Sequence, residues 1–149
     1  MRKIFLILLL FNISCGYTPI NQSNNNNYSI SSYELNGNNQ VNRIIKKNFD
    51  RYNSEEDIDN QFQIKISSEV VKITNSKSVT GKNSNLSIKV VVNSIITKNS
   101  KDFKELSYEE VVNYNSLENK FELKQYEEIL IEDLTKKILN RIHFILLTN

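Results

Sequence analysis

Few residues in this chain of 149 could carry out covalent chemistry, because it has one cysteine, Cys15, and one histidine, His143. A zinc site needs several Cys, His or carboxylate ligands, and nucleophilic catalysis needs a nucleophile beside a base. His143 lies in an apolar stretch with no Asp or Glu three or four residues away. We therefore expect a packed or surface histidine rather than a catalytic one. The sequence also contains no Gly-rich phosphate-binding loop.

Two groups of acidic residues remain as candidates for acid–base or cation chemistry. Glu109 and Glu110 are adjacent in an expected strand, where successive side chains point to opposite faces. Glu55, Glu56 and Asp57 lie in a polar loop, which favours solvation over weak cation binding. We expect no enzymatic activity, no metal site and no cofactor.

The environment of Cys15 is the most specific feature of the sequence. Arg2 and Lys3 are basic, residues 4–11 are almost wholly apolar, and Ser14 precedes the cysteine. A basic start, an apolar run and a small residue at the cleavage site are typical of a secretory signal peptide. The apolar run is far shorter than the roughly 20 residues that span a bilayer. The sequence thus predicts a signal peptide at residues 1–14.

The residues before Cys15, Asn12-Ile13-Ser14, resemble the bacterial lipobox, although Asn12 replaces the usual aliphatic residue. The resemblance implies a diacylglyceryl thioether on Cys15 and an acylated new amino terminus. The alternative is a buried cysteine. Each buried CH₂ contributes about 0.8 kcal/mol, so two or three chains would anchor the protein durably. Gly16 stands where Asp would retain a Gram-negative lipoprotein at the inner membrane, which favours the outer membrane by analogy.

The charge balance excludes one class of partner. The full chain has 19 Lys+Arg and 17 Asp+Glu, and loss of Arg2 and Lys3 leaves 17 of each. A mature protein with no net charge is not a strongly basic nucleic-acid-binding protein. We therefore expect no nucleic-acid partner.

The segment after Cys15 is expected to be a tether. Residues 21–29 are polar and lack periodicity, so they cannot bury enough apolar surface to order themselves. We assign residues 15–29 to the lipidated terminus and tether and residues 30–149 to one folded domain. A short strand is expected from Tyr28 to Leu35, followed by a turn in which Asn38 or Asn39 caps a helix.

A first helix is predicted over residues 40–52. Its apolar residues recur at helical spacing: Val41, Ile44, Ile45, Phe49 and Tyr52. Four basic residues lie mostly off this stripe: Arg43, Lys46, Lys47 and Arg51. We expect these basic residues to form a solvent-exposed helix face. The alternative is that they contact anionic lipid or a partner.

Three strands follow, because apolar and polar residues alternate from Phe62, from Leu86 and from Leu106. The alternation slips near Val70 and Val71, which a β-bulge or the end of the buried face would explain. Polar turns are expected at residues 75–85 and 98–104. Consecutive strands with short links indicate an antiparallel meander.

A long helix is predicted over residues 120–147, and its apolar end, residues 143–147, packs in the core or meets a partner. We therefore expect an α+β fold: a two-layer sandwich with an antiparallel sheet of about four strands and two helices on one face. The neighbour of the first strand is not fixed by the sequence.

The mature chain resembles the lipopolysaccharide-assembly lipoprotein family (LptE-like). The resemblance rests on the opening Cys15-Gly16-Tyr17, the order of elements, residues 111–115 (VVNYN) before the last helix, and residues 121–132 and 134–142 within it. It implies an outer-membrane lipoprotein on the periplasmic face. Such proteins plug and help to assemble a large β-barrel, LptD, and assist lipopolysaccharide transport to the outer leaflet.

The resemblance also implies binding of lipopolysaccharide, whose phosphates basic groups could meet. Lys72, Lys77 and Lys82 surround the first turn of the meander and are the candidates, with Lys65 and Lys89 on the solvent face of the sheet. Ordinary solubilising lysines are the alternative. Two other functions stay open: a lipoprotein subunit of another envelope transport or assembly complex, and an envelope hydrolase, which the missing nucleophile–base set disfavours.

Overall fold

The computed structural model describes residues 28–52, 60–77, 79, 81, 83–99 and 101–148. Its elements are β1 (Ser29–Gly37), α2 (Asn39–Phe49), β2 (Gln61–Lys77), β3 (Asn83–Lys98), β4 (Lys101–Asn115) and α3 (Lys120–Leu147). The predicted signal peptide and residues 15–27 of the predicted tether lie outside the described residues. Tyr28 and Ser29 are buried, so the folded domain includes two residues that the sequence assigned to the tether.

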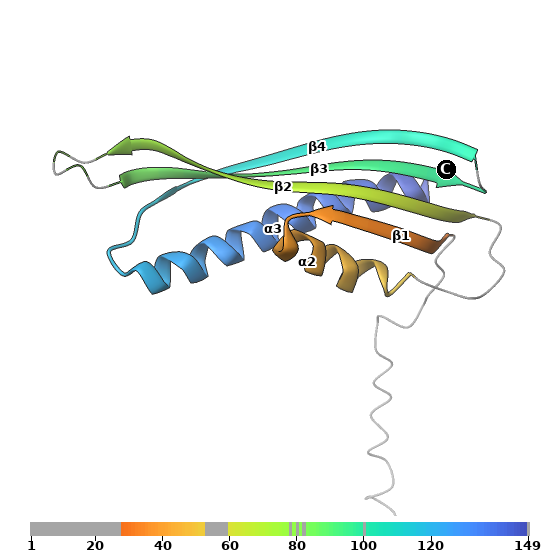
Figure 1. Cartoon of the computed structure of the whole chain (residues 1–149), viewed down its shortest axis with the longest axis horizontal. Coiled ribbons are helices and arrows are strands. Elements are labelled where there is room, and N and C mark those ends of the chain that lie inside the picture. The colour runs from red at the N-terminus through yellow and green to blue at the C-terminus, as the bar shows by residue number, and fades with distance from the viewer. Residues whose placement is uncertain are drawn as a thin grey trace, which may run out of the picture.

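The four strands form one sheet in the order β1-β2-β3-β4, and both helices lie on the same side of it (Figure 1). The predicted α+β class, the strand number and the one-sided helices are confirmed. β2, β3 and β4 form the expected antiparallel meander. β1, however, pairs parallel to β2, so the sheet is mixed rather than wholly antiparallel. α2 lies between β1 and β2 in the chain, and a crossover connection of this kind is what parallel neighbours require.

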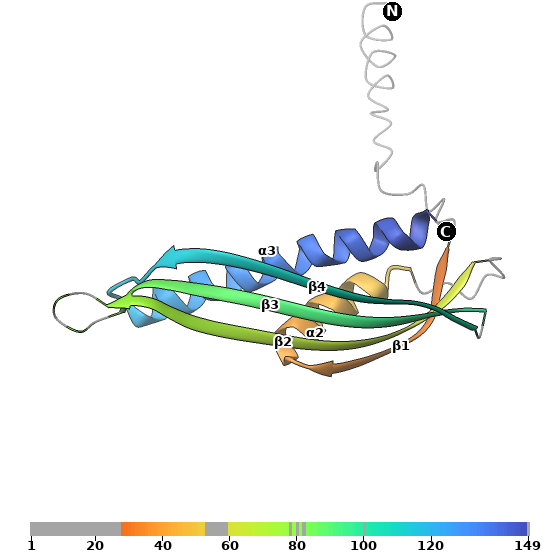
Figure 2. The same ribbon diagram turned by 90° about the horizontal axis from the view of Figure 1, so that it is seen from above.

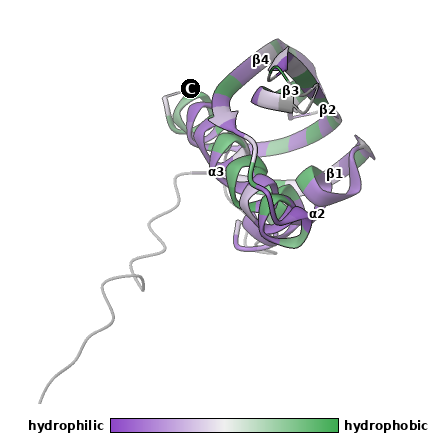
Figure 3. Cartoon of the chain, turned by 90° about the vertical axis from the view of Figure 1, so that its left-hand side faces the viewer, coloured by the Kyte–Doolittle hydropathy of each residue, from purple (hydrophilic) through white to green (hydrophobic). Residues whose placement is uncertain are grey.

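The inner face of the sheet is apolar because side chains alternate along each strand. Seen end-on, green and purple segments alternate along the ribbons (Figure 3). β2 pairs with β3 without a register shift from Phe62 to Thr74, so the slip near Val70 is not a bulge. Instead the buried face ends there: Ile73 lies on the outer side of the sheet and is 43% exposed.

The β2–β3 hairpin is longer than predicted. β2 continues to Lys77 and β3 begins at Asn83, inside the segment expected to be a turn. Polar side chains hydrogen-bond across this extension, with Asn75 Nδ2 donating to Asn85 Oδ1 over 2.8 Å. Pairing between polar side chains stabilises a strand without producing the apolar alternation that sequence patterns detect.

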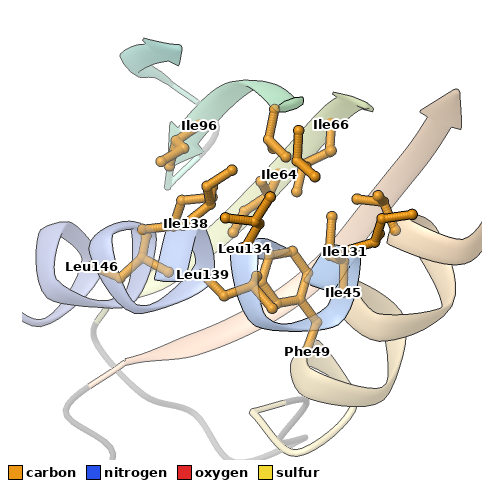
Figure 4. Close-up of a cluster of buried hydrophobic side chains, with 14 of the residues drawn as sticks. Ile45, Phe49, Ile64, Ile66, Ile96, Ile131, Leu134, Ile138, Leu139 and Leu146 are labelled. Atoms are coloured by element: carbon orange, nitrogen blue, oxygen red, sulfur yellow. The ribbon is translucent and has the colours of Figure 1, made fainter. Parts of the chain in front are cut away.

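Each helix is capped by asparagine and buries one stripe. The Asn38 side chain accepts hydrogen bonds from the first turn of α2, and Asn119 does the same for α3. Figure 4 shows Ile45 and Phe49 of α2 and five residues of α3 facing the sheet residues Ile64, Ile66 and Ile96. The five residues of α3 are Ile131, Leu134, Ile138, Leu139 and Leu146.

The apolar end of α3 was predicted to pack in the core or to meet a partner, and its residues differ in burial. Ile142 and Leu146 are buried in the core, whereas Phe144 and Leu147 are 64% and 53% exposed. Viewed from above, this end of α3 lies near the start of β1 (Figure 2). Within the described residues, no helix is long and apolar enough to cross a bilayer.

Gly37 makes the passage from β1 to α2 possible. Its φ of +100° lies in the region that favours glycine. A Cβ on this residue would stand 1.9 Å from the carbonyl oxygen of Ser68. The backbone of β1 therefore approaches β2 too closely here for any side chain.

Candidate functional site

The structure describes two of the four candidate site residues, Lys72 and Lys77. Cys15 and Lys82 lie outside the described residues. Lys77 is exposed at the end of β2, and Lys72 lies five residues before it on the same strand. The described residues show no contact that joins Lys72 and Lys77 into one site.

Lys72 takes part in a polar cluster that holds three elements together. Its Nζ donates to Oε2 of Glu127 in α3, and the hydroxyl of Tyr114 in β4 donates to Oε1 of the same carboxylate over 2.6 Å. Glu127 is 8% exposed, so both of its oxygens find partners within the protein. Burial and this hydrogen bond raise the pKa of Tyr114 above its ordinary value. We call Lys72, Tyr114 and Glu127 the Glu127 cluster.

The Glu127 cluster changes the interpretation of Lys72. A lysine whose ammonium is bonded to a buried carboxylate is less able to meet a phosphate than an unpaired one. Sequence patterns identified the lysine but not Glu127, which lies 55 residues further along the chain.

A second polar cluster lies at the opposite end of α3. His143 Nδ1 faces the hydroxyl of Tyr28, His143 Nε2 faces Oδ1 of Asn48, and the ring of Tyr52 lies 4.5 Å from the imidazole. Burial lowers the pKa of His143 to about 4, so the imidazole is neutral at pH 7. Because Asn48 Oδ1 only accepts, Nε2 carries the proton and Nδ1 accepts from Tyr28. We call Tyr28, Asn48, Tyr52 and His143 the His143 cluster.

The His143 cluster confirms a packed histidine and adds partners that the sequence did not reveal. Tyr28 and Asn48 are separated from His143 by 115 and 95 residues, and no local pattern links them. The cluster joins the start of β1, the end of α2 and the end of α3. Its role in the fold is therefore to fix the point where the N-terminal segment enters the domain.

Among the described elements, both helices lie on the inner side of the sheet, so the outer face is left without a helix (Figure 1). Lys65 and Lys89 lie on it and pair with Glu34 at 3.6 Å and with Glu109 at 3.4 Å. Exposed apolar residues lie among these charges: Ile73, Ile95 and Val111. A face that mixes ion pairs, amides and aliphatic groups can pack against a polar protein wall.

A groove of about 820 Å³ runs between α2 and α3. Three of the four basic residues singled out in α2 and the turn after it line one wall: Arg43, Lys47 and Arg51. The other wall carries Glu132, which pairs with Lys136 over 2.7 Å. Ile44 and Ile129 contribute apolar surface. The lining of the groove is thus partly apolar and carries more basic than acidic side chains.

The described residues contain no group of three or more His, Cys, Asp or Glu side chains placed to hold a metal ion.

No protein-family model and no curated protein sequence matches the chain. Several solved structures do match. The crystal structure of rare lipoprotein B from Shewanella oneidensis superposes with a TM-score of 0.55 at 12% identity, covering 74% of this chain and 89% of that one. A Caulobacter crescentus protein gives 0.54 at 10% identity over 78% and 88% of the two chains. A minor lipoprotein from Acinetobacter baumannii gives 0.52 at 10% identity over 76% and 90%. The described domain therefore has the fold seen in these bacterial lipoproteins.

Proposed function

We propose that this chain is an outer-membrane lipoprotein, anchored at Cys15 on the periplasmic face. It plugs and helps to assemble an LptD-type β-barrel, and it assists lipopolysaccharide transport to the outer leaflet. The observation that carries the proposal is the fold, which matches rare lipoprotein B over most of both chains. The lipobox-like residues before Cys15 support the same conclusion independently.

The shape of the domain suits a plug. β2 and β3 have 17 and 16 residues, which at roughly 3.3 Å per residue makes a ribbon over 50 Å long. This exceeds the roughly 30 Å of a bilayer's hydrocarbon core, so the ribbon can extend through a barrel. The uncovered outer face offers polar and aliphatic groups to a polar inner wall.

Lys72 is a weaker candidate for lipopolysaccharide contact than the other two lysines, because its ammonium is bonded to Glu127. Lys77 and Lys82 remain the candidates for phosphate contact at the hairpin end, and Lys77 is exposed. Lys72 would have to leave Glu127 to join them. We therefore expect charge removal at Lys77 and Lys82 to weaken binding of purified lipopolysaccharide more than charge removal at Lys72.

Copurification from native membranes tests the proposal. The full chain, tagged after Asn149, should bring down one large outer-membrane β-barrel protein, and salt should weaken its binding to purified lipopolysaccharide. Recovery of a different envelope complex without a barrel would replace the proposal with the second function, a subunit of another transport or assembly machine. A Cys15→Ala chain is the control, and it should lose stable membrane association.

A further inference from the structure

One side of α2 has a charge pattern that the fold does not use. At about 3.6 residues per turn, Arg43, Lys46 and Lys47 lie opposite the buried stripe of Val41, Ile45 and Phe49. Arg51 follows in the turn after the helix. All four basic residues are exposed: Arg43, Lys46, Lys47 and Arg51. Among the described residues none of them forms an ion pair. We call these four residues the basic face.

Two acidic groups beside the basic face have partners of their own. The Asp50 carboxylate accepts a hydrogen bond from the Tyr33 hydroxyl. Across the groove Glu132 pairs with Lys136, and this bond, with Lys47 also contributing, lowers the pKa of the Glu132 carboxyl. The groove lining carries four cations, Arg43, Lys47, Arg51 and Lys136, against the two carboxylates of Glu128 and Glu132. The surplus of positive charge can attract an external anion.

The N-terminal segment brings the basic face towards a membrane. Tyr28 stacks on Tyr52 with ring centroids 5.3 Å apart, and Ile30 N donates to the carbonyl of Tyr52 over 3.0 Å. The chain therefore enters the domain beside the end of α2. Cys15 precedes Tyr28 by 13 residues, which cannot span more than about 45 Å. An acyl anchor on Cys15 would keep this end of α2 within about 45 Å of the bilayer surface.

We infer that the basic face docks on the anionic phospholipid headgroups of the leaflet that holds the lipid anchor. The inference rests on the anchored lipoprotein proposed above and adds a second membrane contact, which orients the domain. Basic residues close to an anionic surface are attracted within about a Debye length, and such a patch commonly supplements an acyl chain. Exposed Ile129 lies in the same groove and can meet the region below the headgroups.

Vesicle cosedimentation of the non-acylated mature chain tests this contact without the anchor. Residues 15–149 with Cys15→Ser keep every described residue, and the core begins at Tyr28. This protein should bind phosphatidylcholine vesicles that contain phosphatidylglycerol, should not bind phosphatidylcholine alone, and should dissociate at high salt. Replacing the basic face by glutamine should weaken binding by at least about 100-fold, because each cation contributes roughly fivefold.

The matched control removes four other exposed lysines: Lys101, Lys104, Lys120 and Lys124. It changes the net charge equally and should keep most of the binding. Equal loss in both quadruple variants would overturn the inference, since binding would then follow total charge. No binding of the unsubstituted chain would also overturn it and would favour an acidic protein partner. Neither result depends on acylation of Cys15 or on recovery of a β-barrel, so the proposed function is tested separately.

Discussion

The two ends of α3 bury polar groups in opposite ways. Near its start, the side-chain oxygens of Glu127 accept hydrogen bonds from Lys72 and from the Tyr114 hydroxyl. Near its end, His143 is held as a neutral imidazole between Tyr28 and Asn48. Burying a charge is costly unless it is paired. The start of α3 pairs its buried carboxylate with a lysine, whereas the end of α3 buries its histidine in the neutral form. The comparison predicts that acid, charge removal and loss of a hydroxyl will affect the two ends differently.

The largest expected effect is acid destabilisation through His143. Its folded pKa of about 4 lies below the unfolded value of 6.5, so the unfolded chain binds the proton first. The neutral imidazole therefore makes its full contribution to the free energy of unfolding above pH 6.5. This contribution falls by roughly 3 kcal/mol as the pH drops towards 4. Urea titrations from pH 7 to pH 5 should show about 2 kcal/mol of this loss.

His143→Phe is the control for this titration. This is the chain's one histidine, so the variant should lose the pH dependence between 6.5 and 5.5 whatever its absolute stability. An unchanged pH dependence in His143→Phe would mean that the imidazole is not buried in its neutral form.

Glu127→Gln should have the next largest effect, lowering the free energy of unfolding by about 2 kcal/mol. The glutamine amide has no charge to pair with the Lys72 ammonium, and its single oxygen replaces the two carboxylate oxygens that accept from Lys72 and from Tyr114. Thermal or urea unfolding at pH 7 measures the change. Glu128→Gln, which removes the exposed carboxylate of the next residue, should change stability by less than about 0.5 kcal/mol. Equal effects of the two variants would contradict the Glu127 cluster.

Tyr28→Phe should lower stability by about 1 kcal/mol, because it removes the hydroxyl that His143 Nδ1 accepts from. Its diagnostic signal is the imidazole itself. In an NMR titration, the His143 ring should keep its low pKa, because burial rather than Tyr28 is the cause of the shift. A return of that pKa towards 6.5 in Tyr28→Phe would show that the hydroxyl, not burial, controls the imidazole.

The smallest effect is expected for Lys72→Met, at roughly 0.5 kcal/mol, because the Lys72 side chain is 54% exposed and its pair is partly screened. A double-mutant cycle with Glu127→Gln isolates the pairwise energy. A coupling near zero would return Lys72 to the set of lysines available for phosphate contact.

Local periodicity accounts for the parts of the fold that the sequence could predict. Phe62, Ile64 and Ile66 alternate because β2 has one buried face, and Val41, Ile45 and Phe49 recur because α2 buries one stripe. The parallel pairing of β1 was missed, although the helix predicted between the first two strands is the crossover that parallel neighbours need. The pattern of residues 29–37 did not identify β2 as their neighbour. The extended hairpin was missed because Asn75 and Asn85 stabilise it without apolar alternation.

For the candidate sites, too, the sequence showed single residues but not the partners that the fold brings to them. Lysines stand out in a sequence, but their partners do not: Glu127 and Tyr114 meet Lys72 only in three dimensions. The basic residues of α2 could be seen to lie off its apolar stripe, whereas the position of their helix beside the N-terminal entry at Tyr28 required the structure.

Acyl chains on Cys15 are proposed to hold this domain at the envelope, and the intact mass of the protein purified from native membranes reports whether they are present. We expect a chain that begins at Cys15 and carries the added mass of a diacylglyceryl group with further N-acylation. A chain that retains residues 1–14, or one that begins at Cys15 without acyl groups, would contradict it.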